Sequence, residues 1–207
     1  KYLEIQPTII TGWNVDGFDI PYLYNRAQQI VGKNIADCLS PVSKVYWNKY
    51  RERYMIAGVS CLDYLMLYKN FTFSSKPSYR LDDIGQSEVG TSKISYDGTL
   101  NDLYENHLED FVKYNIHDVR IVKKLDDKLD FIDVARGICH VGHVPYEDIV
   151  YDSRFLEGAI LVYLKKLGVV APNKAPRDDV KKDGKFAGAY VQDPQKGRHD
   201  WVYDLDV

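Results

Sequence analysis

The feature that most constrains the fold is a strand–turn–helix pattern near the start of the sequence. An apolar, β-branched run at residues 7–13 ends in a turn, and residues 18–32 then have the pattern of a helix, with Pro21 in its first turn and Gly32 just past its end. Strands alternating with helices are typical of α/β proteins, whose functional residues gather at the carboxyl ends of strands. The pattern therefore predicts an α/β fold with a site at this turn.

Composition limits the classes of protein to consider. With 207 residues, 45% of them hydrophobic, the chain is long enough for one large domain or two small ones. A net charge of −3 gives no overall basic field, but it does not exclude nucleic acid, because a nuclease site carries its own carboxylates. The three cysteines form no Cys-x-x-Cys pair, which argues against a disulfide scaffold or zinc site. No apolar run is long enough to span a membrane, so we expect a cytoplasmic protein with no membrane partner.

The rest of the chain continues the α/β pattern. Further helices are predicted at residues 61–71, 77–90, 100–136 (with a kink or a break near Asn115) and 153–168. An aromatic and basic stretch at 44–57 is predicted to form a hairpin, and 91–98 a turn or short strand. Residues 171–185, rich in Pro, Gly and charge, indicate a linker before two strands at 186–194 and 200–207. Both ends of the sequence interrupt such patterns, from which we expect a fragment of a longer protein.

Asp19, at the start of the first helix, has two explanations. An Asp at this position is a common N-cap that contributes about 1 kcal/mol. It could instead hold a metal, because the turn also carries Asn14 and Phe18 at the expected site edge of the sheet. The stretch by itself leaves both explanations open.

A second group of polar residues lies about a hundred positions further on. Tyr114 and Asp118 are four residues apart, so a helix places them on one face. The carboxylate could hold a divalent cation while the phenol hydrogen-bonds the water that attacks a phosphate, and Lys93 could offer its positive charge to that phosphate. The alternative is a packed Tyr beside a solvated Asp and a solvated Lys.

The predicted hairpin mixes basic and aromatic side chains, among them Tyr46, Trp47, Lys49 and Arg51. This mixture suits phosphate contacts combined with base stacking. An exposed ribbon whose tyrosines face a domain core would show the same composition.

Taken in order, these motifs resemble those of family B DNA polymerases, in particular the branch of T4-like phage replicative polymerases. The stretch "TGWNVDGFDIPYLYNR" is similar to the second motif of their 3′→5′ proofreading exonuclease, and "YNIHDV" is similar to the third. "FAGAYV" resembles the family's Tyr-x-Gly-Gly/Ala motif, which contacts DNA, and "VYDLDV" resembles the opening of polymerase motif A. The resemblance covers essentially the whole chain.

The resemblance implies a role for each matching residue. Asp19 and Asp118 would be metal-binding carboxylates of the exonuclease, Tyr114 would orient the attacking water, and Lys93 would face the scissile phosphate. Asp206 would bind metal in the polymerase site. The hairpin would help to move a primer end between the two sites. The implied DNA contacts are Asn14, Phe18, Tyr46, Trp47, Lys49, Arg51, Phe186, Gly188 and Ala189. The implied cofactor is Mg²⁺ or Mn²⁺ in a two-metal site, which suits carboxylate ligands.

The resemblance also implies an architecture. Residues 1–140 would form a ribonuclease-H-like α/β exonuclease domain that lacks its first strands, 141–175 a helical connector, and 176–207 the start of a polymerase palm. The implied partners are primer–template DNA, a single-stranded 3′ end and a dNTP, with a sliding clamp or a complementary polymerase fragment as further candidates. A phage protein of this kind would work in the cytoplasm of its bacterial host.

One departure from the family concerns activity. The first exonuclease motif, Asp-x-Glu, is absent from the sequence, so we expect the isolated chain to be inactive or nearly so. Two other functions fit parts of the sequence. One is a non-catalytic DNA-binding or replication-partner module with an exonuclease-like fold. The other is a different ribonuclease-H-like nuclease, which the "FAGAYV" and "DLDV" stretches disfavour.

Overall fold

The structure, a computed structural model, describes residues 1–96, 98–173, 193 and 195–201. The chain divides into two units, Lys1–Val170 and Ala171–Val207. Four predicted site residues, Phe186, Gly188, Ala189 and Asp206, lie outside the described residues, as do most of the two strands predicted after residue 185. The predicted domain boundaries at 140 and 175 remain predictions.

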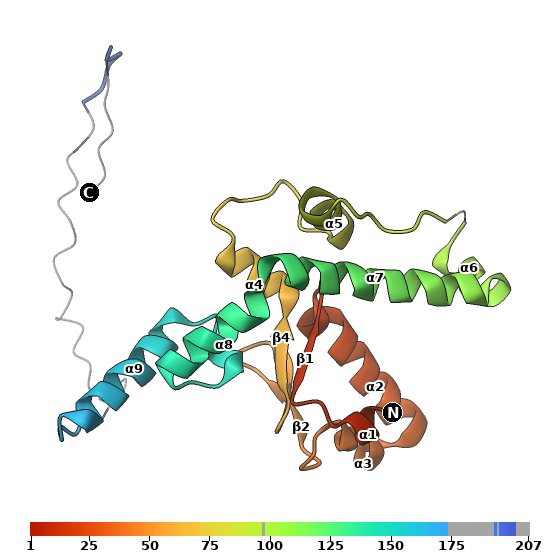
Figure 1. Cartoon of the computed structure of the whole chain (residues 1–207), viewed down its shortest axis with the longest axis horizontal. Helices are drawn as coiled ribbons and strands as arrows, with labels where there is room; N and C mark the ends of the chain where they lie inside the picture. The colour runs from red at the N-terminus through yellow and green to blue at the C-terminus, as the bar shows by residue number, and fades with distance from the viewer. Residues whose placement is uncertain (97, 174–192, 194, 202–207) are drawn as a thin grey trace. The chain divides into compact units, whose positions relative to one another are not determined.

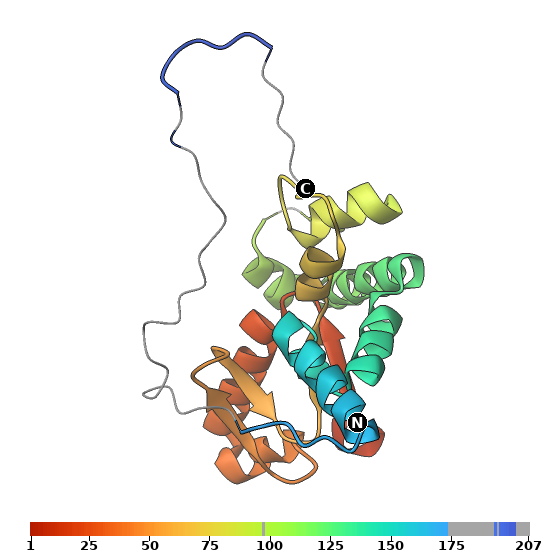
Figure 2. The same cartoon turned by 90° about the vertical axis from the view of Figure 1, so that its left-hand side faces the viewer.

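The N-terminal half of the first unit contains the predicted strand, helix and hairpin. Its elements are α1 (Tyr2–Ile5), β1 (Ile9–Gly12), the π-helical turn η1 (Val15–Asp19), α2 (Ile20–Val31), α3 (Lys33–Ala36), the 3₁₀ turn η2 (Asp37–Leu39), β2 (Val45–Asn48), β3 (Arg53–Ile56) and β4 (Ser60–Asp63). α2 confirms the helix predicted over 18–32, and β2 and β3 pair antiparallel where the hairpin was predicted. Figure 2 shows this hairpin beside α2, where the rings of Tyr24 and Tyr54 lie 5.0 Å apart.

The C-terminal half of the unit is helical. Its elements are α4 (Tyr64–Phe71), α5 (Leu81–Val89), α6 (Leu100–Asn106), α7 (Leu108–Leu129), α8 (Phe131–Gly142), the 3₁₀ turn η3 (Tyr146–Asp148) and α9 (Asp152–Lys166). The predicted break near Asn115 is not found, because α7 runs through that residue. The breaks come instead at His107, which is not helical, and at Asp130, which adopts a left-handed conformation (φ 60°). None of the helices in the described ranges is both long and apolar enough to cross a membrane.

A two-stranded parallel sheet lies at the centre of the described unit. β1 pairs with β4, from Ile9 opposite Ser60 to Gly12 opposite Asp63, so both strands end at the same edge. Figure 1 shows α7 crossing this edge. The prediction that residues 61–63 begin a helix is wrong, because they form the end of β4. Both faces of this strand are covered, and its apolar run therefore shows no alternation that would separate it from the helix that follows.

Neighbouring residues of β4 belong to two different cores. Cys61, 6% exposed, packs in a core with η1, α2, α3 and the hairpin strands. Leu62, 2% exposed, packs in the other core with α4, α5, α7 and α8. Because successive strand residues point to opposite faces, one short strand joins the two layers. The same alternation holds in β1, where Ile9 contacts the second core and Ile10 the first.

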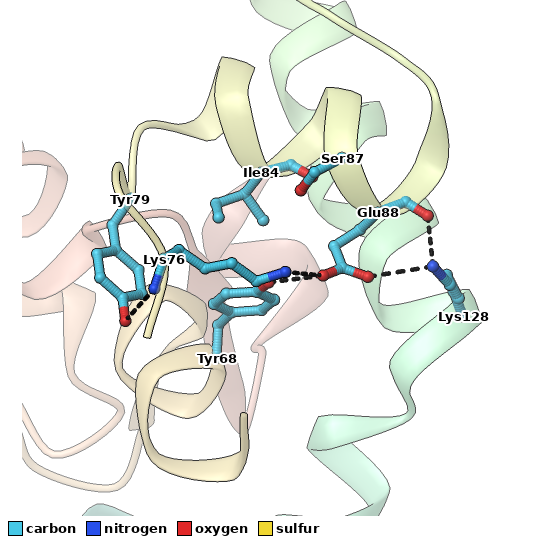
Figure 3. Close-up of polar contacts among 7 residues, drawn as sticks. All are labelled: Tyr68, Lys76, Tyr79, Ile84, Ser87, Glu88 and Lys128. Carbon is cyan, nitrogen blue, oxygen red and sulfur yellow. Dashed lines mark hydrogen bonds and ion pairs between the residues drawn. The ribbon is translucent and has the colours of Figure 1, made fainter. Parts of the chain in front are cut away.

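A network of hydrogen bonds and ion pairs connects α5 to α4, to the loop after α4 and to α7. The Glu88 carboxylate accepts hydrogen bonds from the hydroxyl of Tyr68 (2.7 Å), from Lys76 Nζ (3.0 Å) and from Lys128 Nζ (3.1 Å) (Figure 3). These partners come from α4, from the loop that follows it, and from α7. Only 16% of the Glu88 side chain is exposed. The hydrogen bonds from Tyr68 and the two lysines lower the pKa of Glu88 to about 2.

Because of this network, we expect the free energy of unfolding to depend on pH in the acidic range. Because the pKa of Glu88 falls from 4.5 to about 2 on folding, its ionised form stabilises the protein above pH 4.5, and this contribution is lost as the pH falls through 2. We expect Glu88→Gln to lower the free energy of unfolding by about 2 kcal/mol at pH 7. Urea denaturation at several pH values would measure the difference from wild type, which should shrink below pH 4.5. A difference that stays constant down to pH 2.5 would contradict this account.

Candidate active site

The turn between β1 and α2 is fixed by hydrogen bonds to the buried carboxylate of Asp63. Asp63, 5% exposed, ends β4 and accepts hydrogen bonds from the backbone N–H groups of Asn14 (3.0 Å), Asp16 (3.1 Å) and Leu65 (3.0 Å). The last of these bonds caps α4, and the other two fix η1. Asn14 itself adopts a left-handed conformation (φ 62°) that Asn tolerates better than most residues. One side chain thus joins both strand–helix connections at the site edge of the sheet.

Asp19, the last residue of η1, is exposed to the cleft described below. Its side chain makes no capping hydrogen bond to α2, so the N-cap explanation is not supported. Partial burial raises the pKa of Asp19 above its ordinary value, and the negative charge of Asp63 adds to this shift. A carboxylate that does not bond its own helix is free to bind a cation.

The second predicted group is assembled on α7. Lys93 Nζ donates hydrogen bonds to Asp118 Oδ2 (2.6 Å) and to the hydroxyl of Tyr114 (3.1 Å). The backbone N–H of Lys93 donates to Asp82 Oδ1 (2.6 Å), which fixes the segment after α5 that carries this lysine. Burial disfavours the charged amine, but the hydrogen bonds to Asp118 and Tyr114 outweigh that effect and raise the pKa of Lys93. The lysine is therefore a cation in this site.

All four predicted catalytic residues line one open cleft of about 1220 Å³ between η1, α7 and the segment after α5. Asp19 is the last residue of η1, Lys93 lies in the segment after α5, and Tyr114 and Asp118 lie on α7. The predicted DNA contacts Asn14 and Phe18 line the same cleft, and the ring of Phe18 stacks on that of Tyr22 (6.1 Å between centroids). The structure brings these residues together, while their individual roles remain predictions.

The donor set can be tested against a divalent metal. Asp118 Oδ1 is buried and has no hydrogen-bond partner among the residues that the structure describes, whereas its other oxygen accepts a hydrogen bond from Lys93. An unpaired buried carboxylate oxygen is costly unless a cation or donor satisfies it. Within the described ranges, no three His, Cys, Asp or Glu side chains gather closely enough to form a complete metal site. Asp19 and Asp118, two of the aspartates that line the cleft, therefore fit part of an oxygen-ligand site of the kind that Mg²⁺ and Mn²⁺ prefer.

The hairpin residues lie away from this cleft. Tyr46 and Trp47 are 44% and 48% exposed, and Lys49 is also exposed, so these three are accessible to a ligand. Arg51 instead turns inward, pairs with Asp148, and lies 5.4 Å from the ring centre of Tyr151. The DNA-binding role of all four hairpin residues remains a prediction.

Sequence reasoning missed three residues that shape the site: Asp16, Arg53 and Asp63. Asp63 follows an apolar run and precedes a helix, which is the same pattern that drew attention to Asp19. This repeated pattern of strand, Asp and helix could therefore have identified Asp63 from the sequence. The pairing of Asp16 with Arg53 had no signal of its own, because nothing local connects two residues on a turn and a hairpin.

Comparison with known proteins identifies the family. Residues 1–84 match the family described as "DNA polymerase family B, exonuclease domain". The chain is 35% identical over 208 residues to the DNA-directed DNA polymerase of Enterobacteria phage T4, covering 98% of this chain and 23% of that protein. It is 35% identical over 207 residues to the DNA-directed DNA polymerase of Escherichia phage RB69, covering 97% of this chain and 22% of that protein.

A more distant relative is also a DNA polymerase. The DNA polymerase of Heliothis virescens ascovirus 3e is 25% identical over 242 residues, covering 95% of this chain and 22% of that protein. The chain thus spans less than a quarter of the length of these relatives. The described part has the mixture of helices and a small sheet expected of an α/β exonuclease domain. The chain belongs to DNA polymerase family B and carries part of its exonuclease domain.

Proposed function

We propose that the chain forms part of a replicative DNA-directed DNA polymerase and contributes to the site that removes nucleotides from a single-stranded 3′ end. The observation that carries this proposal is the cleft in which Asp19, Lys93, Tyr114 and Asp118 meet from three separate segments. The match to the exonuclease domain and the phage polymerase relatives support the same function.

Two carboxylates of the cleft would hold the metals. We assign Asp118 Oδ1 and the carboxylate of Asp19, which makes no capping hydrogen bond to α2, as ligands for Mg²⁺ or Mn²⁺. When bound, a pair of such ions supplies an activated water and neutralises the charge on the phosphate. The elevated pKa of Asp19 fits this role, because a nearby cation favours the ionised form that burial disfavours.

Lys93 and Tyr114 would act on the phosphate and the attacking water. Because Lys93 Nζ donates to the Tyr114 oxygen, the phenolic hydrogen remains free to donate toward the cleft. That hydrogen can orient a water or a non-bridging phosphate oxygen. Lys93 keeps its positive charge while it bonds Asp118, and the same charge can balance a phosphate in the cleft.

The remaining contacts would select a single-stranded end. Phe18 is 62% exposed on the cleft and offers a ring face, already stacked on Tyr22, to a terminal base. A mismatched primer end unpairs at lower cost than a matched one, so it reaches such a site more often. We extend the proposal to primer–template DNA and dNTPs as substrates of the whole polymerase, with a sliding clamp or a complementary polymerase fragment as partner, in the cytoplasm of a bacterial host.

The test uses a chimera of the phage T4 polymerase in which the matching segment is replaced by these 207 residues. A 5′-labelled single-stranded oligonucleotide with Mg²⁺ reports removal of 3′ nucleotides, and primer extension reports that the chimera is folded. We expect the chimera to shorten the oligonucleotide, and Asp118→Asn to slow this at least about 100-fold with primer extension unchanged.

The matched control is Asp110→Asn, the same substitution on the same helix at an exposed residue that pairs with Lys113. It should leave both reactions unchanged. A chimera that extends primers but does not shorten the oligonucleotide would count against the proposed function and favour a DNA-binding module. A chimera that shortens the oligonucleotide equally well with Asp118→Asn would contradict the proposed site.

A further inference from the structure

The turn end of the β2–β3 hairpin is attached to the body of the protein by two arginines. Arg51 in the turn pairs with Asp148, and Arg53 at the start of β3 pairs with Asp16. Both guanidinium groups also donate to the carbonyl oxygen of Glu147 (3.4 and 3.3 Å). The Arg53 side chain is only 14% exposed, so its contact is largely shielded from solvent.

The contact made by Arg53 reaches the proposed active site. Asp16 lies in η1, three residues before Asp19, and its side chain is 12% exposed. Its backbone N–H is fixed by Asp63 (3.1 Å), and its carboxylate is fixed by Arg53. The turn that presents Asp19 is therefore held from two sides, by the sheet through Asp63 and by the hairpin through Arg53.

The Arg53–Asp16 ion pair forms fewer hydrogen bonds than its two charged groups could make. A guanidinium and a carboxylate can form two parallel hydrogen bonds. Here Arg53 Nη1 donates to Asp16 Oδ2, while Arg53 Nε and Asp16 Oδ1 are buried and have no partner in the described part of the chain. Removing either partner would leave the other as a buried, uncompensated charge, which costs far more than losing a surface pair.

We propose that Arg53 is a positioning residue that couples the hairpin to the metal-binding carboxylate of Asp19. A displacement of the hairpin would pull on Asp16 and so shift the end of η1. The inference rests on the proposed function, in which Asp19 is a metal ligand, and it adds a residue that touches neither metal nor DNA.

Manganese binding to the 207-residue chain tests this coupling without requiring activity. The electron paramagnetic resonance signal of free Mn²⁺ gives the dissociation constant. We expect Arg53→Met to weaken Mn²⁺ binding about fivefold, and Arg53→Lys to restore most of the loss by supplying one donor to Asp16. In an Asp19→Asn background, Arg53→Met should have no further effect.

The control is Arg136→Met, which removes the same charge from an exposed Arg–Asp pair, with Asp133 (3.0 Å), on α8. It should leave Mn²⁺ affinity within about twofold of wild type. Circular dichroism shows whether each variant is folded. If Arg53→Met does not fold, the Mn²⁺ affinity of Arg53→Lys still tests the coupling.

Two results would overturn the inference in different ways. Equal losses from Arg53→Met in the wild-type and Asp19→Asn backgrounds, or a loss no larger than that of Arg136→Met, would refute the coupling alone. Mn²⁺ affinity that is unchanged by both Asp19→Asn and Asp118→Asn would refute the proposed metal site, and the inference with it.

Discussion

Replacing Asp63 by Ala is expected to lower the free energy of unfolding by about 3 kcal/mol, because three partly buried backbone N–H groups lose their acceptor at once. Each of these bonds is made to a carboxylate oxygen, and the substitution would remove the acceptor of all three donors. Burial raises the pKa of Asp63 and offsets part of this gain, which is why we expect less than the sum of three charged hydrogen bonds.

The measurement is urea denaturation, with Thr99→Ala as the control. Thr99 caps α6 through one hydrogen bond to the N–H of Asp102 (3.2 Å), so its loss should cost about 1 kcal/mol. Asp63→Asn keeps one acceptor oxygen and should fall between the two. If Asp63→Ala costs no more than Thr99→Ala, Asp63 is an ordinary cap and does not organise the site.

The second large effect is expected at Gly85, where α5 approaches α7. A Cβ atom there would lie 2.6 Å from the carbonyl oxygen of Thr91 and 2.8 Å from Cγ2 of the buried Ile121. Gly85→Ala should therefore destabilise the protein by about 2 kcal/mol, because the two helices must separate. Since Lys93 follows α5 closely, the separation should also weaken its contact with Asp118.

Gly137→Ala provides the matched control. Gly137 lies in α8, and among the described residues outside its own helical turn no atom comes within 4 Å of a Cβ added there, so the same substitution should stabilise the helix by up to about 1 kcal/mol. Thermal unfolding of the two variants should give shifts of opposite sign. Shifts of the same sign would show that the Gly85 contact is not the tight one described here.

Local signals were enough to predict the parts of the site that lie within one segment. The β-branched run before Asp19 indicated a strand, and Pro21 and Gly32 bounded the helix correctly. The four-residue spacing of Tyr114 and Asp118 required only that their segment be helical, and α7 satisfies this.

The errors came where tertiary contacts override local patterns. Residues 61–63 form a strand because β1 lies beside them, a long-range pairing that the apolar run does not specify. The break at Asp130 depends on a left-handed residue that is neither Gly nor Asn, so the usual stop signal is missing. The pairing of Arg53 with Asp16 joins residues 37 positions apart, and only the folded hairpin brings them together.

The most direct test of the central claim is a crystal of the chain soaked in Mn²⁺ and measured at the manganese absorption edge. We expect an anomalous peak in the cleft, in contact with the carboxylates of Asp118 and Asp19. Crystals that bind Mn²⁺ elsewhere while this cleft stays empty would contradict the claim that these two residues hold the metal of an exonuclease site.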